Sequence, residues 1–245
     1  MENAQLIGLS RQVALRRQMD VVANNMANLN TTGFKAESML FEEYIMPVAA
    51  DRDFQLPDQP LSYTQDWATI HDFRAGSIFQ TGNDLDIALE GEGFLVVQTE
   101  AGERYTRNGA LTLNNLGELV TAEGDRVVSD GGFMVFDASE TNIAIGKDGS
   151  VRSSAGAKGT LRIVEFENPQ DLTREGDTMF AGDNPQIATN TRVIQGAIER
   201  SNVSGVAEMT EMMRITRAYT SLAQLMQRQD QLRSSAIQKL GTLSA

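Results

Sequence analysis

The chain has 245 residues, no cysteine and a formal net charge of −12, a length that suffices for one large or two modest domains with a hydrophobic core. The charge is uneven, because residues 1–35 and 199–245 each sum to +2 and residues 36–198 therefore carry −16. The acidic middle argues against nucleic acid as a partner, since phosphate binding requires a basic surface, and the lack of cysteine excludes disulfides, thiolate metal sites and a cysteine nucleophile.

The sequence has no apolar run of 18 residues and no basic-then-apolar start followed by a cleavage site. We therefore expect neither a membrane span nor a cleaved signal peptide. A cytoplasmic protein and a protein secreted without a cleaved signal would both show this pattern, so both interpretations stay open.

A helix is predicted over residues 1–35, ending at residues 30–33. Gly33 marks its end, because glycine adopts the left-handed conformation that closes a helix C-terminus. Apolar residues spaced 4, 3, 4 and 3 form a heptad seam that requires a partner helix. The seam residues are Leu15, Met19, Val22, Met26 and Leu29.

The face of this helix away from the seam is polar and has two interpretations. Asn24 and Asn28, with Asn25 nearby, could form a solvated surface beside a fraying helix end. Alternatively, these short amides and the small Ala23 and Ala27 would allow several helices to approach closely and hydrogen-bond across the contact. The spacing alone does not separate the two.

Residues 36–74 are predicted to form an irregular connector. One short helix around residues 41–45 is compatible with the pattern, but three prolines between residues 47 and 60 interrupt anything longer. His71, the only histidine, is expected at the surface. Without a second histidine or a cysteine, a zinc site is not expected.

Residues 75–197 are predicted to form an antiparallel β domain, because short apolar runs alternate with glycine, asparagine and aspartate turns. Turn signals include Asn108-Gly109, Asp148-Gly149 and the stretch 129–132. The candidate strands are residues 77–80, 86–89, 94–98, 104–106, 111–113, 119–121, 133–136, 143–145, 161–166 and 192–197.

Residues 198–245 are predicted to return to a helix, with Ser204 as a suitable N-cap. Its seam has spacings of 3, 4, 3 and 4 and mirrors the first one. The two ends could therefore pair as an antiparallel hairpin, which gives an α+β fold with a coiled-coil-like helical layer. The second seam comprises Met212, Ile215, Tyr219, Leu222 and Met226.

The combined apolar surface of the two helices is wider than one hairpin needs. Leu6 and Leu9 on the first helix, and Ala207, Met209 and Met213 on the second, are expected to stay partly exposed. Apolar helical surface of this kind marks a place where other subunits pack.

No motif for bond chemistry is present. Acidic pairs such as Asp84/Asp86 and Glu90/Glu92 do not follow calcium-loop spacing and are expected on solvated faces. The sequence has no P-loop, no Rossmann fingerprint and no Gly-x-Ser-x-Gly. We therefore expect no catalytic, cofactor-binding or metal site and no small-molecule substrate.

Several stretches resemble the signatures of flagellar rod and hook proteins, the axial subunits of the bacterial basal body. The first stretch is ANNMANLNTTGFK at residues 23–35, and the second is TGNDLDIALEGEGFLVV at residues 81–97. YTRNGALTL at residues 105–113 and RVIQGAIERSNV at residues 192–203 follow in the family's order. The signature residues singled out are Asn24, Asn25, Ala27, Asn28, Asn30, Thr31, Thr32, Gly33, Phe34, Gly91, Gly93, Phe94, Ser201, Asn202 and Val203.

The length favours a long rod subunit, because the short rod subunits of this family lack a sizeable β domain and hook subunits carry a larger insertion. The opening MENAQLIGL departs from the usual start of the distal-rod type. A proximal-rod subunit is therefore favoured, with a distal-rod subunit as the alternative.

The resemblance implies paired terminal helices as an inner layer and a β domain as an outer layer. It implies partners among other rod subunits and copies of the same chain, export by the flagellar type III apparatus without a cleaved signal, and a location spanning the periplasm. The seam and signature residues would then act as packing surfaces. A competing hypothesis is a monomeric soluble binding module, whose terminal hairpin would close entirely within one chain.

Overall fold

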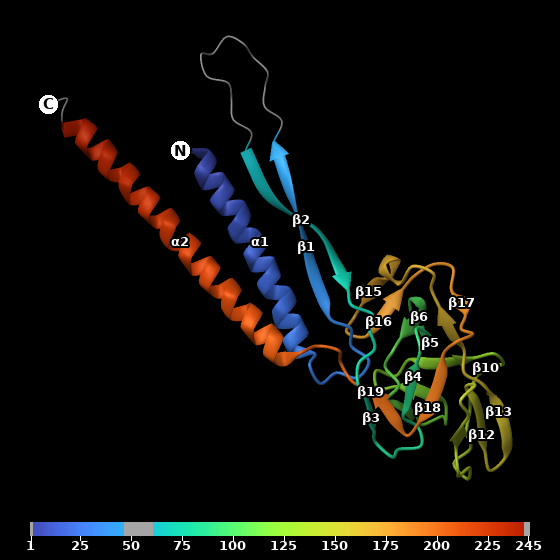
Figure 1. Ribbon diagram of the computed structural model, residues 1–245. Coiled ribbons are helices and arrows are strands. Elements are labelled where there is room, and N and C mark those ends of the chain that lie inside the picture. Colours follow the sequence, from blue (N-terminus) through green and yellow to red (C-terminus); the bar gives the residue numbers. More distant parts are fainter. Residues whose placement is uncertain (1, 47–60, 243–245) are drawn as a thin grey trace. The chain divides into compact units, whose positions relative to one another are not determined.

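The computed structural model describes residues 2–46 and 61–242, which divide into two compact units (Figure 1). A helix near each end and antiparallel strands between them confirm the predicted α+β class. Residues 2–26, 37–46, 61–70 and 205–242 form the helical unit, and residues 27–36 and 71–204 form the β unit.

The two helices are α1 (Glu2–Ala27) and α2 (Gly205–Thr242). α1 ends earlier than the predicted stop at residues 30–33, and residues 28–30 form a turn. There the Thr31 hydroxyl donates to Asn28 Oδ1 at 2.9 Å, a local side-chain bond of the kind that competes with helix continuation. α2 begins directly after Ser204, the predicted cap, rather than at residue 198.

The irregular connector expected over residues 36–74 is wrong, and so is the short helix within it. The structure instead contains β1 (Glu37–Met46) and β2 (Leu61–His71), which pair with each other in a two-stranded sheet. Both stretches carry aromatic and aliphatic residues, and each strand satisfies the other's backbone groups. The three prolines used in that prediction lie outside the described residues.

The β unit is built from short strands joined by tight turns, as predicted. Its strands are β3 (Ile78–Gln80), β4 (Ile87–Glu90), β5 (Phe94–Thr99), β6 (Gly102–Thr106), β7 (Leu111–Leu113), β8 (Leu119–Thr121), β9 (Arg126–Ser129), β10 (Gly132–Phe133), β11 (Ala144–Ile145), β12 (Ser150–Ser153), β13 (Gly156–Thr160), β14 (Ile163–Glu165), β15 (Thr173–Glu175), β16 (Met179–Ala181), β17 (Gln186–Ile187), β18 (Arg192–Gln195) and β19 (Ala197–Glu199). One 3₁₀ turn, η1 (Pro169–Asp171), precedes β15.

The largest sheet has the order β15-β16-β6-β5-β9-β8-β7. β10 pairs with β9, β14 pairs with β5, and β17 pairs with β14. Smaller sheets contain β11-β12-β13, β18-β4 and β19-β3. The pairings of β3 to β19 are antiparallel, which confirms the predicted type of sheet.

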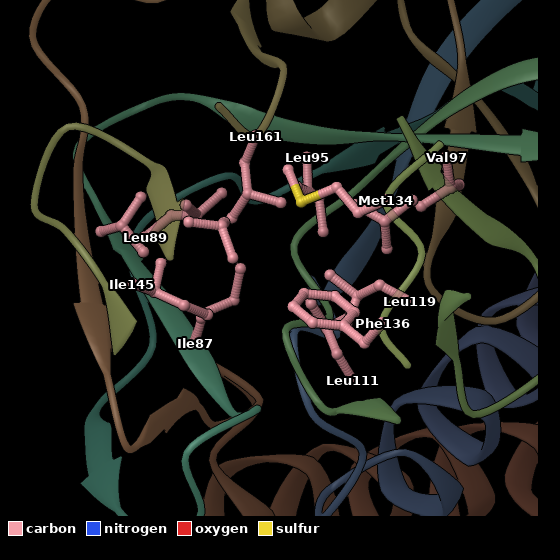
Figure 2. Packing of buried hydrophobic residues seen from close by; sticks show 13 residues of the cluster. Ile87, Leu89, Leu95, Val97, Leu111, Leu119, Met134, Phe136, Ile145 and Leu161 are labelled. Atoms are coloured by element: carbon pink, nitrogen blue, oxygen red, sulfur yellow. The ribbon is translucent and has the colours of Figure 1, made fainter. Parts of the chain in front are cut away.

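Strand β5 has a hydrophobic cluster on each face, because successive side chains of a strand point to opposite sides. Leu95 and Val97 belong to the larger cluster, which Figure 2 shows with Met134 and Leu161 close to them. Phe94 and its aromatic neighbours form the second cluster on the other face. With both faces covered, the first four residues of β5 are fully buried.

The prediction that His71 lies at the surface is wrong. Only 8% of this residue is exposed, and its ring packs edge-on against Phe73 and Phe180 at centroid distances of 5.8 and 5.4 Å. His71 ends β2 and belongs to the β unit. The aromatic cluster explains its burial, because the flat imidazole ring fits among phenyl rings.

Candidate functional site

The two predicted seams pack against each other within the chain. Leu15 and Val22 of α1 and Ile215 of α2 are buried at 8%, 5% and 0% exposure. The further side chains packed around them are Met19, Met212, Ala218, Tyr219 and Leu222. Each apolar stripe therefore removes the other from water, which is the main stabilisation available to helices of this kind.

Polar contacts show that α1 and α2 run in opposite directions. Residues of increasing number on α1 bind residues of decreasing number on α2. The contacts are Gln5 Nε2 to Asp230 Oδ1 (2.7 Å), Gln18 Nε2 to Glu211 Oε1 (2.9 Å) and Asn25 Nδ2 to Glu208 Oε1 (3.3 Å). The antiparallel hairpin is thus formed inside one chain.

The remaining seam residues are less enclosed. Met26 and Met226 are half-buried. Met226 lies opposite Gly8, where a Cβ on the glycine would stand 3.3 Å from the methionine sulfur. Leu29 is 36% exposed and lies after the end of α1. Its spacing fits the predicted seam, but it is not part of the helix.

Many apolar side chains remain exposed on the paired helices. Leu6, Leu9, Met209 and Met213 are between 49% and 56% exposed, and Ala207 is exposed as well, as predicted. Further exposed side chains are Val13, Val206, Leu225, Leu232 and Ile237. Exposed apolar side chains of this kind are candidates for contacts with other subunits.

Asn25, placed by the sequence on a polar face of uncertain role, is 1% exposed. Its side-chain amide donates to Glu37 O (2.8 Å) and its carbonyl oxygen accepts the Glu37 N–H (2.9 Å). The same amide group lies 3.3 Å from Glu208, whose pKa is raised by burial. Asn25 therefore joins α1, β1 and α2, and Asn24 and Asn28 do not share this position.

Gly33 and Phe34 of the first signature are buried in the β unit. Gly33 has φ +71°, and a Cβ there would lie 2.4 Å from the Arg107 carbonyl carbon and the Asn108 nitrogen. Phe34 is 1% exposed beneath the Arg174 guanidinium, which lies 4.2 Å from its ring centroid. The structure thus gives both residues a packing role inside the chain.

Lys35 and Glu199 form a buried ion pair with an Nζ–Oε1 distance of 2.6 Å. Lys35 Nζ also donates to Arg74 O (2.9 Å), and Glu199 Oε1 accepts the Gly76 N–H (2.8 Å). Arg107 approaches the other carboxylate oxygen at 3.5 Å. Burial lowers the pKa of the Lys35 ammonium from its usual value, and the Glu199 carboxylate opposes this shift. No local sequence pattern marks this cluster, because its members lie far apart in the chain.

Asn202 of the C-terminal signature connects three backbone segments of the β unit. Its carbonyl oxygen accepts the Ala36 N–H (2.8 Å), and its amide donates to Asp72 O (2.7 Å) and Arg74 O (3.1 Å). The neighbouring Ser201 hydroxyl accepts the Val203 N–H at 3.3 Å. The signature therefore binds the backbone of its own chain.

The glycines of the middle signature allow close backbone approach. A Cβ on Gly91 or Gly93 would lie 2.8 or 2.6 Å from the Thr191 hydroxyl, which accepts the Gly93 N–H at 2.9 Å. Phe94, next in the chain, is 1% exposed in the aromatic cluster. Gly91-Glu92-Gly93 is thus a packing motif.

The acidic pairs singled out by the sequence do not converge. Across residues 2–46 and 61–242, no three histidine or acidic side chains lie close enough to hold a metal ion. Asp86 accepts hydrogen bonds from Thr81 and Asn83 in its own loop. The same described ranges contain no helix of the length and apolarity that a membrane crossing requires.

The sequence matches three family descriptions. Residues 6–35 match "Flagella basal body rod protein", residues 88–153 match "Flagellar hook protein FlgE/F/G D1 domain", and residues 194–239 match "Flagellar basal body rod FlgEFG protein C-terminal". The three segments lie in α1 and the buried segment after it, in the β unit from β4 to β12, and from the end of β18 into α2.

Curated relatives align over the whole chain. The flagellar basal-body rod protein FlgF of Caulobacter vibrioides is 38% identical, and FlgF of Mesorhizobium japonicum is 30% identical, each over 100% of both chains. The flagellar basal-body rod protein FlgG of Bacillus subtilis is 27% identical over 92% of this chain and 94% of its own.

Proposed function

Because this chain belongs to the flagellar basal-body rod proteins of the FlgF type, we propose that it is a structural subunit of the proximal rod. The full-length alignment to FlgF proteins favours this type over the distal-rod FlgG type. The rod family is structural, so the residues that matter for function are those that pack against other subunits. The proposed location is the flagellar basal body across the periplasm, reached through the flagellar export apparatus.

The observation that carries the packing role is the apolar surface left on the helix pair. The seam is already satisfied within the chain, yet Leu9 and Met209 remain 51% and 56% exposed. Burying one leucine or methionine contributes roughly 1.5–3 kcal/mol, so several such residues can supply a stable contact. The partner surfaces belong to copies of this chain and to other rod subunits.

The proposed contacts are heterologous, with different faces of one subunit meeting those of the next. Contacts of this type that do not close into a ring generate helical assemblies. Ala27 at the end of α1 and Leu29 and Asn30 after it are exposed as well. The buried signature residues support it from within, because they hold the chain in its fold.

The test replaces exposed apolar residues in a flagellated host that lacks its own copy of the gene. Leu9→Asp and Met209→Asp are expected to leave the purified monomer folded, because both side chains are half exposed, and to abolish incorporation into isolated basal bodies. Ser221→Asp adds the same charge at an exposed position of α2 and is the matched control. Wild-type incorporation of both apolar-site variants would contradict the proposal and favour a hairpin that serves only its own chain.

A further inference from the structure

Residues 33–36 link α1 to β1, but they are bound within the β unit. Gly33 N–H donates to Glu199 O at 2.8 Å, and the Lys35 ammonium binds the same residue's carboxylate. Ala36 binds Asn202 through its N–H. We call residues 33–36 together with Glu199 and Asn202 the anchor.

The anchor lies at the point where the chain departs for both helices. α1 ends at Ala27 and α2 begins at Gly205. Only residues 28–32 and 203–204 therefore separate the anchored backbone from the two helices. Without the β unit, the helices would be joined only through the whole intervening chain.

We propose that the anchor is the nucleation point of the helix pair, so that α1 and α2 close from this end towards their free ends. The first turn of α2 and the last turn of α1 are held together before any seam contact forms. Closing a flexible loop costs free energy that grows with the logarithm of its length. A short connection on each side removes most of that cost from helix pairing.

The seam is closed in the halves of the helices next to the anchor. Val22 and Ile215, which lie there, are 5% and 0% exposed. Lys35 and Asn202 act as positioning residues for a packing surface that they do not themselves form.

The experiment is amide hydrogen exchange on the full-length protein at low concentration. In the wild type, protection is expected to be highest near residues 22 and 215 and to fall towards residues 5 and 232. Asn202→Ala removes three backbone contacts of the anchor. Gly33→Ala introduces a Cβ 2.4 Å from the Arg107 backbone at a left-handed φ. Both variants are expected to keep the exchange of β5 and to lose protection in α1 and α2.

The control is Val151→Ala, which removes a buried contact in the larger cluster of the β unit without touching the anchor. It is expected to weaken the β unit and leave helix protection unchanged. Unchanged helix protection in both anchor variants overturns the proposal. A wild-type profile that is highest at the distant ends also overturns it, and this measurement requires no variant.

Discussion

Lys35 and Glu199 are 164 positions apart in the sequence, yet Nζ lies 2.6 Å from Oε1 and their side chains are 0% and 1% exposed. Two charges removed from water in this way hold the segment after α1 against β19. Their mutual attraction offsets the free energy of desolvation, whereas either charge buried without the other would be strongly destabilising. The pair therefore ties residues 33–36 to β19 within the β unit.

Lys35→Met is expected to lower the free energy of unfolding of the β unit by roughly 3–5 kcal/mol, because the Glu199 carboxylate stays buried with Arg107 as its remaining cation. Urea denaturation followed by far-UV circular dichroism measures this loss of unfolding free energy. Arg104→Met breaks the exposed pair with Glu175 and should cost less than about 1 kcal/mol. Equal small losses in both variants would contradict the assignment.

Gly109→Ala is expected to prevent the β unit from folding, with a loss above about 4 kcal/mol. A Cβ at Gly109 would lie 1.8 Å from Ile87 O, and Ile87 N–H donates to Gly109 O at 2.9 Å, so neither backbone can move freely. Gly131→Ala is the control, because a Cβ there meets nothing within 4 Å. Expression of soluble, cooperatively unfolding protein reports the difference, and a well-folded Gly109→Ala variant would refute this prediction.

Phe180→Ala should destabilise the β unit by roughly 3–5 kcal/mol, since it opens a cavity in the aromatic cluster around Phe94 and His71. Ile187→Ala changes a side chain that is 83% exposed and should stay within about 0.5 kcal/mol of the wild type. Thermal and urea unfolding of the two variants give the comparison. A loss below 1 kcal/mol at Phe180 would be incompatible with its packing.

Ile215→Asp should separate the helix pair and leave the β unit folded. Ile215 is 0% exposed between Leu15 and Val22, and a carboxylate there would be buried without a partner. Hydrogen exchange of α1 and α2 should become fast while that of β5 is retained. Thr216→Asp, one residue further on an exposed face, should change little. Loss of β5 protection in Ile215→Asp would show that the two units do not fold independently.

Acid should weaken the β unit partly through Glu140. The Lys158 ammonium, 2.5 Å from Glu140 Oε1, lowers the pKa of this carboxyl below its ordinary value of 4.5. The stabilisation is therefore present above that ordinary value and is lost as the pH falls through the lower, folded-state pKa. Unfolding free energies of the wild type and Glu140→Gln, measured from pH 6 to 3, should converge as the pH falls. Parallel pH profiles would exclude this contribution.

Much of the fold followed from local pattern. The boundaries of β7 and β8 match the predicted strands at residues 111–113 and 119–121, because Gly117 permits a turn between two alternating runs. Six strands of the β unit were not predicted, namely β9, β12, β13, β15, β16 and β17. β13, for example, reads Gly-Ala-Lys-Gly-Thr, and such residues pair only because a neighbouring strand is already in place.

The sequence by itself determined the two terminal helices, their complementary seams, the antiparallel body and the family. It determined them because helical and strand periodicity depend on residues close together in the chain. Only the tertiary structure decided that His71 is buried, that residues 37–46 and 61–71 pair as strands, and that Asn25, Lys35 and Asn202 bind partners inside the chain. Burial and pairing of a polar group depend on which distant segments surround it, and the free energy of desolvation is set by those surroundings rather than by neighbours in sequence.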